Sequence, residues 1–299
     1  MAVLTWGAIL QDVRLAGVGH SLTLGSEDLG AYLDPMAYFG AIVGPVANRV
    51  SGAGFALDGQ RFALEANEGP NTLHSERTGT HAQVWSVAEH SGASLTLALD
   101  LPDRLGGFPG NRQIEARYDL EGATLRLSLR ATSDAPTVMN LANHSYWNLD
   151  GSEDTSEHLL QIETDQWLAL DEANLPTGEV EDVAGTRFDL REGRVLEDAF
   201  DHNFCLSVQQ QALRPVAWLT GAAGVGFEMA TTEPGLQVYT ADGLSTGVFA
   251  GHRGTPYGSR AGVALEAQGW PDAPNRPAFP SVRLEPGQTY AQTTEWRFR

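Results

Sequence analysis

The chain has 299 residues, of which 42% are hydrophobic and 19% are charged, a composition typical of globular proteins. Its 19 Lys or Arg and 38 Asp or Glu residues give a formal net charge of −19, so nucleic acids and anionic membranes are poor partners. No lysine occurs, which excludes Schiff-base, pyridoxal-phosphate and P-loop chemistry. The single cysteine, Cys205, excludes disulfide frameworks and iron–sulfur clusters, and its apolar neighbours predict a buried, inert thiol.

Hydrophobic and polar residues alternate along much of the chain with the two-residue period of half-buried β-strands. The pattern is cleanest over 124–130, where Leu125, Leu127 and Leu129 are expected to face a core. Arg126 and Arg130, on the other face, are expected to face solvent. In chain order, strands are predicted near residues 84–87, 95–99, 113–120, 124–130, 158–163, 227–231, 236–240, 262–265 and 295–298.

Helical patterns are scarce, and 33 glycines and 15 prolines indicate many turns. Only residues 196–200 predict a single helical turn. The fold is therefore predicted to be all-β, a large antiparallel β-sandwich with few short helices, in one domain over residues 1–299. No secretory signal pattern and no apolar run near the roughly 20 residues of a membrane span occur, which predicts a cytoplasmic location.

Several short motifs match known functional patterns, but the sequence around them does not support those functions. Residues 243–247 match the G-x-S-x-G nucleophile pattern around Ser245, but no helix is predicted after them, which favours a glycine-rich loop. Gly221, Gly224 and Gly226 indicate a hairpin rather than a dinucleotide site. The eight histidines lack metal-ligand spacing, so no metal is predicted, although folding can gather distant residues.

Five segments place polar residues between apolar neighbours, which is costly inside a protein unless those residues form a network or line a site. They combine amide, guanidinium, imidazole, carboxylate and indole groups, the combination that binds sugars through hydroxyl contacts and aromatic faces. The segments cover residues 47–50, 69–74, 141–149, 200–204 and 265–272.

At these segments the chain resembles the aldose 1-epimerases, also called galactose mutarotases. The resemblance is collinear and covers nearly the whole chain. It rests on Ala-Asn-Arg at 47–49, Gly-Pro-Asn-x-Leu-His at 69–74, Gly-Phe-Pro-Gly at 107–110, Asn-His-Ser-Tyr-Trp-Asn-Leu at 143–149, Leu-Pro-Thr-Gly at 175–178, Phe-Asp-His-Asn-Phe at 200–204, Pro-Gly-x-Gln-x-Tyr-Thr at 234–240 and Leu-Glu-x-Gln at 265–268.

This resemblance implies a β-supersandwich with the sugar in an open cleft on one sheet. It implies Glu266 as the catalytic base, His144 as the catalytic acid and no cofactor. The residues that it implies for holding the monosaccharide are Asn48, Arg49, His74, Asp201 and Gln237. A monomer or a homodimer is expected.

The chain departs from the family pattern at four places around the expected cleft. They are Pro45-Val46, Ser75-Glu76, Ala241-Asp242 and Gly269-Trp270. None of these departures touches the implied acid or base. They therefore leave the preferred sugar open among galactose, glucose, xylose and arabinose.

Interconversion of anomers needs a base for the C1 hydroxyl and an acid for the ring oxygen. Glu266 is expected to act as a carboxylate and His144 as an imidazolium. Because histidine is mostly neutral at pH 7, a nearby carboxylate, with Asp201 as the candidate, is expected to raise the pKa of His144.

Three alternatives stay open at this point. A hexose-6-phosphate 1-epimerase would use the same chemistry, but phosphate needs an arginine cluster and only Arg49 is expected in the site. A glycoside hydrolase would use Asp201 and Glu266 as its carboxylate pair. A non-catalytic sugar-binding module of the same fold would be expected to lack the acid or the base.

Overall fold

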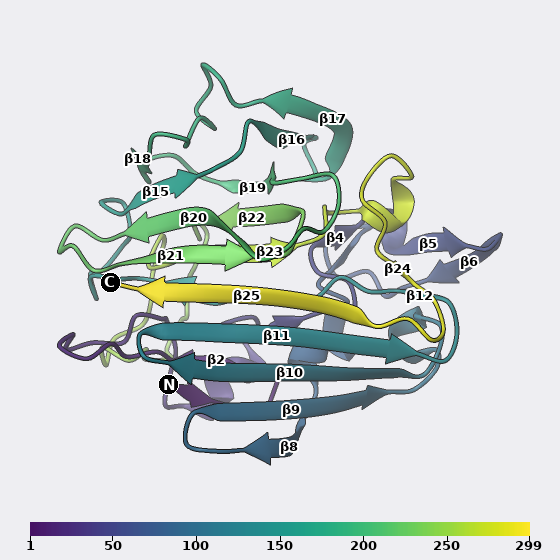
Figure 1. The fold of residues 1–299 in the computed structure, drawn as a ribbon, viewed down its shortest axis with the longest axis horizontal. Helices are drawn as coiled ribbons and strands as arrows, with labels where there is room; N and C mark the ends of the chain where they lie inside the picture. Colours follow the sequence, from purple (N-terminus) through teal and green to yellow (C-terminus); the bar gives the residue numbers. More distant parts are fainter.

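The computed structural model describes residues 1–299, and two large antiparallel sheets dominate it (Figure 1). The nine-stranded sheet faces the viewer in Figure 1, with its longest strands drawn as nearly parallel bands. In spatial order its strands are β18 (Arg194–Val195), β15 (Leu159–Ile162), β20 (Arg214–Thr220), β21 (Gly226–Thr231), β25 (Tyr290–Phe298), β11 (Thr124–Ser133), β10 (Arg112–Glu121), β9 (Ser94–Leu101) and β8 (Ser86–His90).

The second sheet has six strands, and it carries most of the residues expected at the site. In spatial order its strands are β14 (Tyr146–Trp147), β23 (Val263–Gln268), β22 (Gly235–Tyr239), β19 (Asp201–Cys205), β16 (Gln166–Leu170) and β17 (Pro176–Asp182). Both sheets contribute to one core cluster of 40 buried residues, which extends along the chain from Ala8 to Trp296. The two sheets are thus held face to face by apolar burial.

Five two-stranded ribbons and six short 3₁₀ helices complete the fold, without any α-helix. The ribbons pair β1 (Ala2–Val3) with β2 (Leu10–Asp12), β3 (Ile42–Val43) with β13 (Ala142–Asn143), β4 (Arg49–Val50) with β7 (Thr72–Leu73), β5 (Gly54–Leu57) with β6 (Gln60–Ala63), and β12 (Thr137–Val138) with β24 (Arg283–Leu284). The 3₁₀ helices are Leu29–Leu33, Ser51–Ala53, Glu76–Thr78, Thr80–Ala82, Leu105–Gly107 and Ala273–Asn275. None of these short helices has the length or the apolar composition of a membrane-spanning helix.

The predicted all-β sandwich is confirmed, and so is the facing of its clearest strand. In β11, Leu125, Leu127 and Leu129 are buried in the main core, whereas Arg126 and Arg130 are exposed. Gly221 and Gly224 lie in the turn of the β20–β21 hairpin, as expected.

The other local predictions that the structure bears out concern Ser245 and Cys205. Ser245 is exposed in an irregular loop that no helix follows, so the nucleophile-elbow pattern has no structural basis. Cys205 is buried, and burial raises the pKa of its thiol to about 12, which keeps it protonated and inert.

The helical turn predicted over 196–200 is wrong. Leu196 donates its backbone N–H to the carbonyl of His158, and Phe200 donates its backbone N–H to the Thr240 hydroxyl. Both groups are therefore satisfied by residues that lie next to strands β15 and β22 rather than by a helix. The strand expected from residue 84 begins only at Ser86, because Val84 forms a single isolated bridge with Trp6.

Candidate active site

The outward face of the six-stranded sheet is polar along two neighbouring strands. Gln237 on β22 lies directly opposite Glu266 on β23, so the two side chains share one face. Leu236, Val238 and Leu265, the residues that alternate with them, lie in the main core. Because side chains alternate along a strand, Gln237 and Glu266 lie on the sheet face opposite the core.

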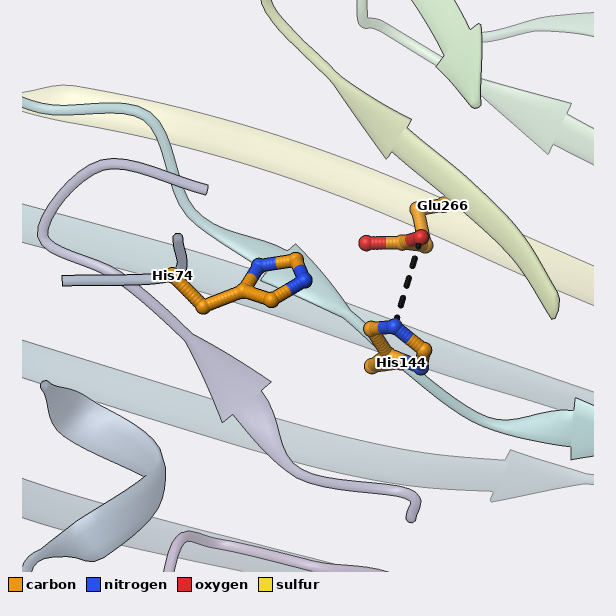
Figure 2. A group of neighbouring side chains, drawn as sticks. All are labelled: His74, His144 and Glu266. Carbon is orange, nitrogen blue, oxygen red and sulfur yellow. Dashed lines mark ion pairs between the residues drawn. The ribbon is translucent and has the colours of Figure 1, made fainter. Parts of the chain in front are cut away.

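His144 approaches this face from the segment between β13 and β14. Its backbone N–H donates to the Ala41 carbonyl at 2.9 Å, and its carbonyl accepts from the Gly40 N–H at 3.0 Å. Its Nε2 lies 3.5 Å from Oε1 of Glu266, and both side chains are buried. Figure 2 shows this pair as the dashed contact, with His74 beside it.

His74 and Asn48 hold each other in left-handed backbone conformations, with φ of 52° and 63°. The Asn48 N–H donates to Nδ1 of His74 at 3.1 Å, and the Asn48 carbonyl accepts from the His74 N–H at 3.1 Å. Since Nδ1 accepts, the proton of the neutral ring lies on Nε2, which is left as a donor. The His74 ring centroid lies 5.2 Å from that of His144.

Arg49 and three other polar side chains form one network. It donates to both carboxylate oxygens of Glu68 at 2.6 and 2.9 Å, and to Oδ2 of Asp201 at 3.2 Å. The other Asp201 oxygen accepts from Nε2 of Gln237 at 2.6 Å. Because its charge is paired on two sides, the buried guanidinium is held in one orientation.

Burial shifts the pKa of both members of the His144–Glu266 pair. The pKa of His144 falls from 6.5 to about 4, chiefly because burial disfavours the imidazolium. The pKa of Glu266 rises well above 4.5 because of burial, with a further rise from the charge of Asp201 and an opposing effect of Arg49. Burial thus favours the neutral form of both groups, with the proton of the pair on Glu266.

The expectation that a carboxylate near His144 raises its pKa is therefore wrong. The carboxylate in contact is Glu266, not Asp201, whose two oxygens face Arg49 and Gln237. Desolvation exceeds the effect of any neighbouring charge on His144. Sequence reasoning missed this shift because burial depends on segments that cover the site from elsewhere in the chain.

The structure brings together all seven residues that the sequence analysis singled out for the site, as the contacts above describe. It also adds Tyr38, whose ring centroid lies 4.8 Å from both His74 and His81 and 5.8 Å from His144. Glu68, the partner of Arg49, was missed as well. Tyr38 lies in an irregular segment with no pattern, so no sequence signal could have identified it.

Three buried atoms of the site have no hydrogen-bond partner within the protein. They are Nδ1 of His144, Oε2 of Glu266 and Oε1 of Gln237. Unpaired buried polar atoms are costly, so they are typical of places where a ligand supplies the missing partner. A small hydroxylated molecule offers both donors and acceptors for them.

The residues that could hold a metal are the same ones. Ligand atoms of His74, His144 and Glu266 all lie within 4.8 Å of one another. Two imidazoles and a carboxylate suit a divalent transition metal. An ion there would engage both members of the His144–Glu266 pair and so displace their proton-transfer chemistry.

An imidazole and a carboxylate in contact, beside unpaired polar groups, define an acid–base site for a small hydroxylated substrate. Comparison with known proteins narrows this class. The sequence profile of the family described as aldose 1-epimerase matches residues 1–297. Galactose mutarotase from Homo sapiens is 37% identical over 309 aligned residues, which cover 99% of this chain and 90% of that protein.

Two further relatives agree. Aldose 1-epimerase from Escherichia coli is 32% identical over 322 aligned residues, covering 100% of this chain and 91% of that protein. The crystal structure of a GalM/aldose epimerase homologue from C. elegans superposes with a TM-score of 0.92 at 28% identity, covering 99% of this chain and 94% of that one. The chain belongs to the aldose 1-epimerase family, and it is an enzyme of the isomerase class.

Proposed function

We propose that the protein interconverts the α and β anomers of a neutral aldose such as galactose or glucose, by opening and closing the sugar ring. The observation that carries the proposal is the buried contact of 3.5 Å between His144 and Glu266. Opening a hemiacetal removes the C1 hydroxyl proton and adds a proton to the ring oxygen. These two positions are neighbours in the sugar, so one acid and one base in contact match the reaction.

Glu266 is assigned as the base for the C1 hydroxyl and His144 as the acid for the ring oxygen. The neutral pair and the ion pair contain the same number of protons, so the reactive arrangement arises when one proton moves from Glu266 to His144. Sugar hydroxyls that bond to the unpaired Oε2 of Glu266 favour its ionised form. Each proton-transfer group contributes roughly 10²–10⁴ in rate.

The remaining residues are assigned to substrate binding. His74 offers its Nε2–H, and Arg49 offers the guanidinium hydrogens that Glu68 and Asp201 leave free. Gln237 offers an unpaired Oε1. Asn48 and Asp201 complete the set, since Asn48 fixes His74 and Asp201 accepts from both Arg49 and Gln237.

The site favours a neutral sugar over a hexose 6-phosphate. Arg49 is the only arginine among the site residues, and its charge is balanced by Glu68 and Asp201. A phosphate there would meet two carboxylates near the single guanidinium. The hydrolase alternative is disfavoured because both Asp201 oxygens are engaged, and the non-catalytic alternative because both acid and base are present.

Polarimetry tests the proposal. Freshly dissolved α-galactose, α-glucose and α-glucose 6-phosphate are followed with and without enzyme in a weakly buffering solution. We expect acceleration for at least one neutral sugar and little for the phosphate ester, and we expect His144→Asn to lose the acceleration. No acceleration with any neutral aldose, or a full rate in His144→Asn, would contradict the proposal.

The proposal also includes a cytoplasmic location, a monomeric or homodimeric state and one folding unit over residues 1–299. Cell fractionation tests the location, and light scattering on a sizing column tests the oligomeric state. A single cooperative unfolding transition, with the same midpoint by fluorescence and circular dichroism, is expected for one unit.

A further inference from the structure

A second cavity, of about 260 Å³, has a lining that differs in charge from the rest of this acidic chain. Two arginines and two histidines line it, namely Arg14, Arg253, His20 and His252, and none of the 38 Asp and Glu residues does. None of the seven expected sugar-site residues lines it either. It is smaller than the 300–1,000 Å³ of typical drug-sized pockets, which suits a small ligand.

Arg253 has a positive charge that no carboxylate of the protein balances. Its Nη1 donates to the carbonyls of Gly151, at 3.2 Å, and Ser152, and its guanidinium lies 5.9 Å from the ring centroid of Tyr257. Arg14 is paired with Asp12 at 2.8 Å but remains more than half exposed. Carbonyl contacts anchor the Arg253 side chain, yet they leave its charge and its other N–H groups for a ligand.

The side chains of His20 and His252 are each held by a hydrogen bond to a backbone carbonyl. Nε2 of His20 lies 3.1 Å from the Leu149 carbonyl, and Nε2 of His252 lies 2.9 Å from the Gln11 carbonyl. A carbonyl oxygen only accepts, so each Nε2 carries the proton and Nδ1 is left without it. Each ring is thus held by one nitrogen, and its Nδ1 makes no hydrogen bond within the protein, which leaves it as an acceptor for a protonated phosphate oxygen.

We propose that this cavity binds a phosphate group, either as free phosphate or as the monoester of a small hydroxylated compound. The planar guanidinium of arginine matches two phosphate oxygens at once; Arg253 supplies one such group without a carboxylate partner, and Arg14 adds a second whose Nε is paired with Asp12. The overall charge of −19 repels anions from most of the surface, so a bound phosphate would have to be held by local contacts. The proposal does not depend on the epimerase activity.

The cavity adjoins the strand that leads away from the catalytic acid. Thr23 and Asn148 both line it. Thr23 forms an isolated antiparallel β-bridge with Trp147 of β14, and Asn148 follows His144 by four residues. An extended segment of that length spans about 13 Å. Phosphate and sugar can therefore bind at the same time, at two sites joined by β14.

Calorimetric titration of inorganic phosphate into the full-length protein at low ionic strength tests this site, with chloride at matched ionic strength as the blank. We expect saturable binding that Arg253→Gln weakens at least tenfold and that Arg14→Gln weakens less. Arg191→Gln is the matched control, because Arg191 is paired with Asp189 and Asp165 elsewhere on the surface and has 38% of its side chain exposed. It should bind phosphate as the wild type does.

A parallel titration with glucose 6-phosphate identifies the source of the phosphate group. Binding that also depends on Arg253 would indicate an ester, and binding of inorganic phosphate alone would indicate the free ion. Glu266→Gln should bind phosphate normally even if the proposed epimerase function failed, so the two proposals fail separately.

Three outcomes would overturn the inference. One is the absence of saturation up to about 10 mM phosphate, roughly ten times the Kd of a weak 1 mM site. Another is unchanged binding in Arg253→Gln with a native circular dichroism spectrum. The third is competition by galactose, which would place the phosphate in the sugar site.

Discussion

The two large sheets each contribute one face to the same core, but the polar side chains on their outward faces differ in whether they have partners within the protein. On the nine-stranded sheet, Arg126 and Arg297 flank Glu295, so the polar groups of this outward face satisfy one another. On the six-stranded sheet, Gln237 and Glu266 are buried and keep unpaired atoms. Polar groups that balance one another indicate a structural face, whereas buried groups that lack partners indicate a binding face.

Cavity size does not identify the candidate site. The outward face of the nine-stranded sheet carries a broad hollow of about 890 Å³, and none of the seven site residues lines it. Its lining includes Arg117 and Asp119, which pair with each other at 2.9 Å. Unpaired buried groups, rather than cavity volume, indicate the candidate site.

The largest difference between the faces should appear when one buried carboxylate on each is neutralised. Glu266 and Glu295 are each 2% exposed. We expect Glu266→Gln to lower kcat by about 10²–10⁴, because it removes a proton-transfer group. Glu295→Gln should leave kcat unchanged and lower the free energy of unfolding by about 1–3 kcal/mol, because it weakens two charge-assisted contacts.

Polarimetry and urea unfolding of both variants give the measurements. The comparison fails if Glu266→Gln keeps a rate near that of the wild type. It also fails if Glu295→Gln loses activity while remaining folded.

Only part of the fold and of the candidate site could be predicted from the sequence. The facing of Leu125, Leu127 and Leu129 was predictable because seven residues of clean alternation define a strand face. Strands β4 and β14 have two residues each, too few to show a period, so tertiary contacts determine them. The site residues were found through their resemblance to a family, since their spacing along the chain does not encode their convergence.

The proton state of the site was not predictable. It depends on how deeply His144 and Glu266 are buried, and that burial comes from segments distant in the chain. Tyr38, which covers three histidines, lies in a stretch without regular structure. Local patterns carry no information about such a cover.

Acid should destabilise the folded protein through the buried histidines in and beside the candidate site. Burial lowers the pKa of His81 and of His144 to about 4, whereas an unfolded histidine titrates near 6.5. The unfolded state therefore takes up protons first as the pH falls, and stability is lost between about pH 6.5 and pH 4, by up to about 3 kcal/mol for each histidine. The urea concentration at the unfolding midpoint should therefore decrease as the pH is lowered from 6.5 to 4.

His81→Gln tests this prediction, because it removes one of the buried histidines and leaves both His144 and Glu266 in place. Its stability should depend less steeply on pH between 6.5 and 4 than that of the wild type. His90, which is exposed on the edge strand β8, provides the control, and His90→Gln should keep the full slope. Equal slopes for all three proteins would show that buried histidines do not cause the acid sensitivity.

Arg49 should affect binding more than chemistry, as expected for a group that holds the sugar. Lysine keeps the charge but cannot bond to both oxygens of Glu68 while reaching Asp201. We expect Arg49→Lys to raise KM by about 10-fold to 100-fold, with a kcat decrease no larger than the rise in KM. Initial rates over a range of galactose concentrations separate the two constants, and a loss confined to kcat would contradict the assignment.

The smallest effect is expected on the outward face of the nine-stranded sheet. Arg117 is 43% exposed in its side chain, and its partners Glu89 and Asp119 are 71% and 30% exposed. Water screens such pairs, so Arg117→Gln should lower the free energy of unfolding by less than about 1 kcal/mol and leave KM and kcat unchanged. A loss of several kcal/mol would show that this exposed ion pair is important for stability, and a changed KM would show that this face takes part in substrate binding. Either result would contradict the contrast between the two faces.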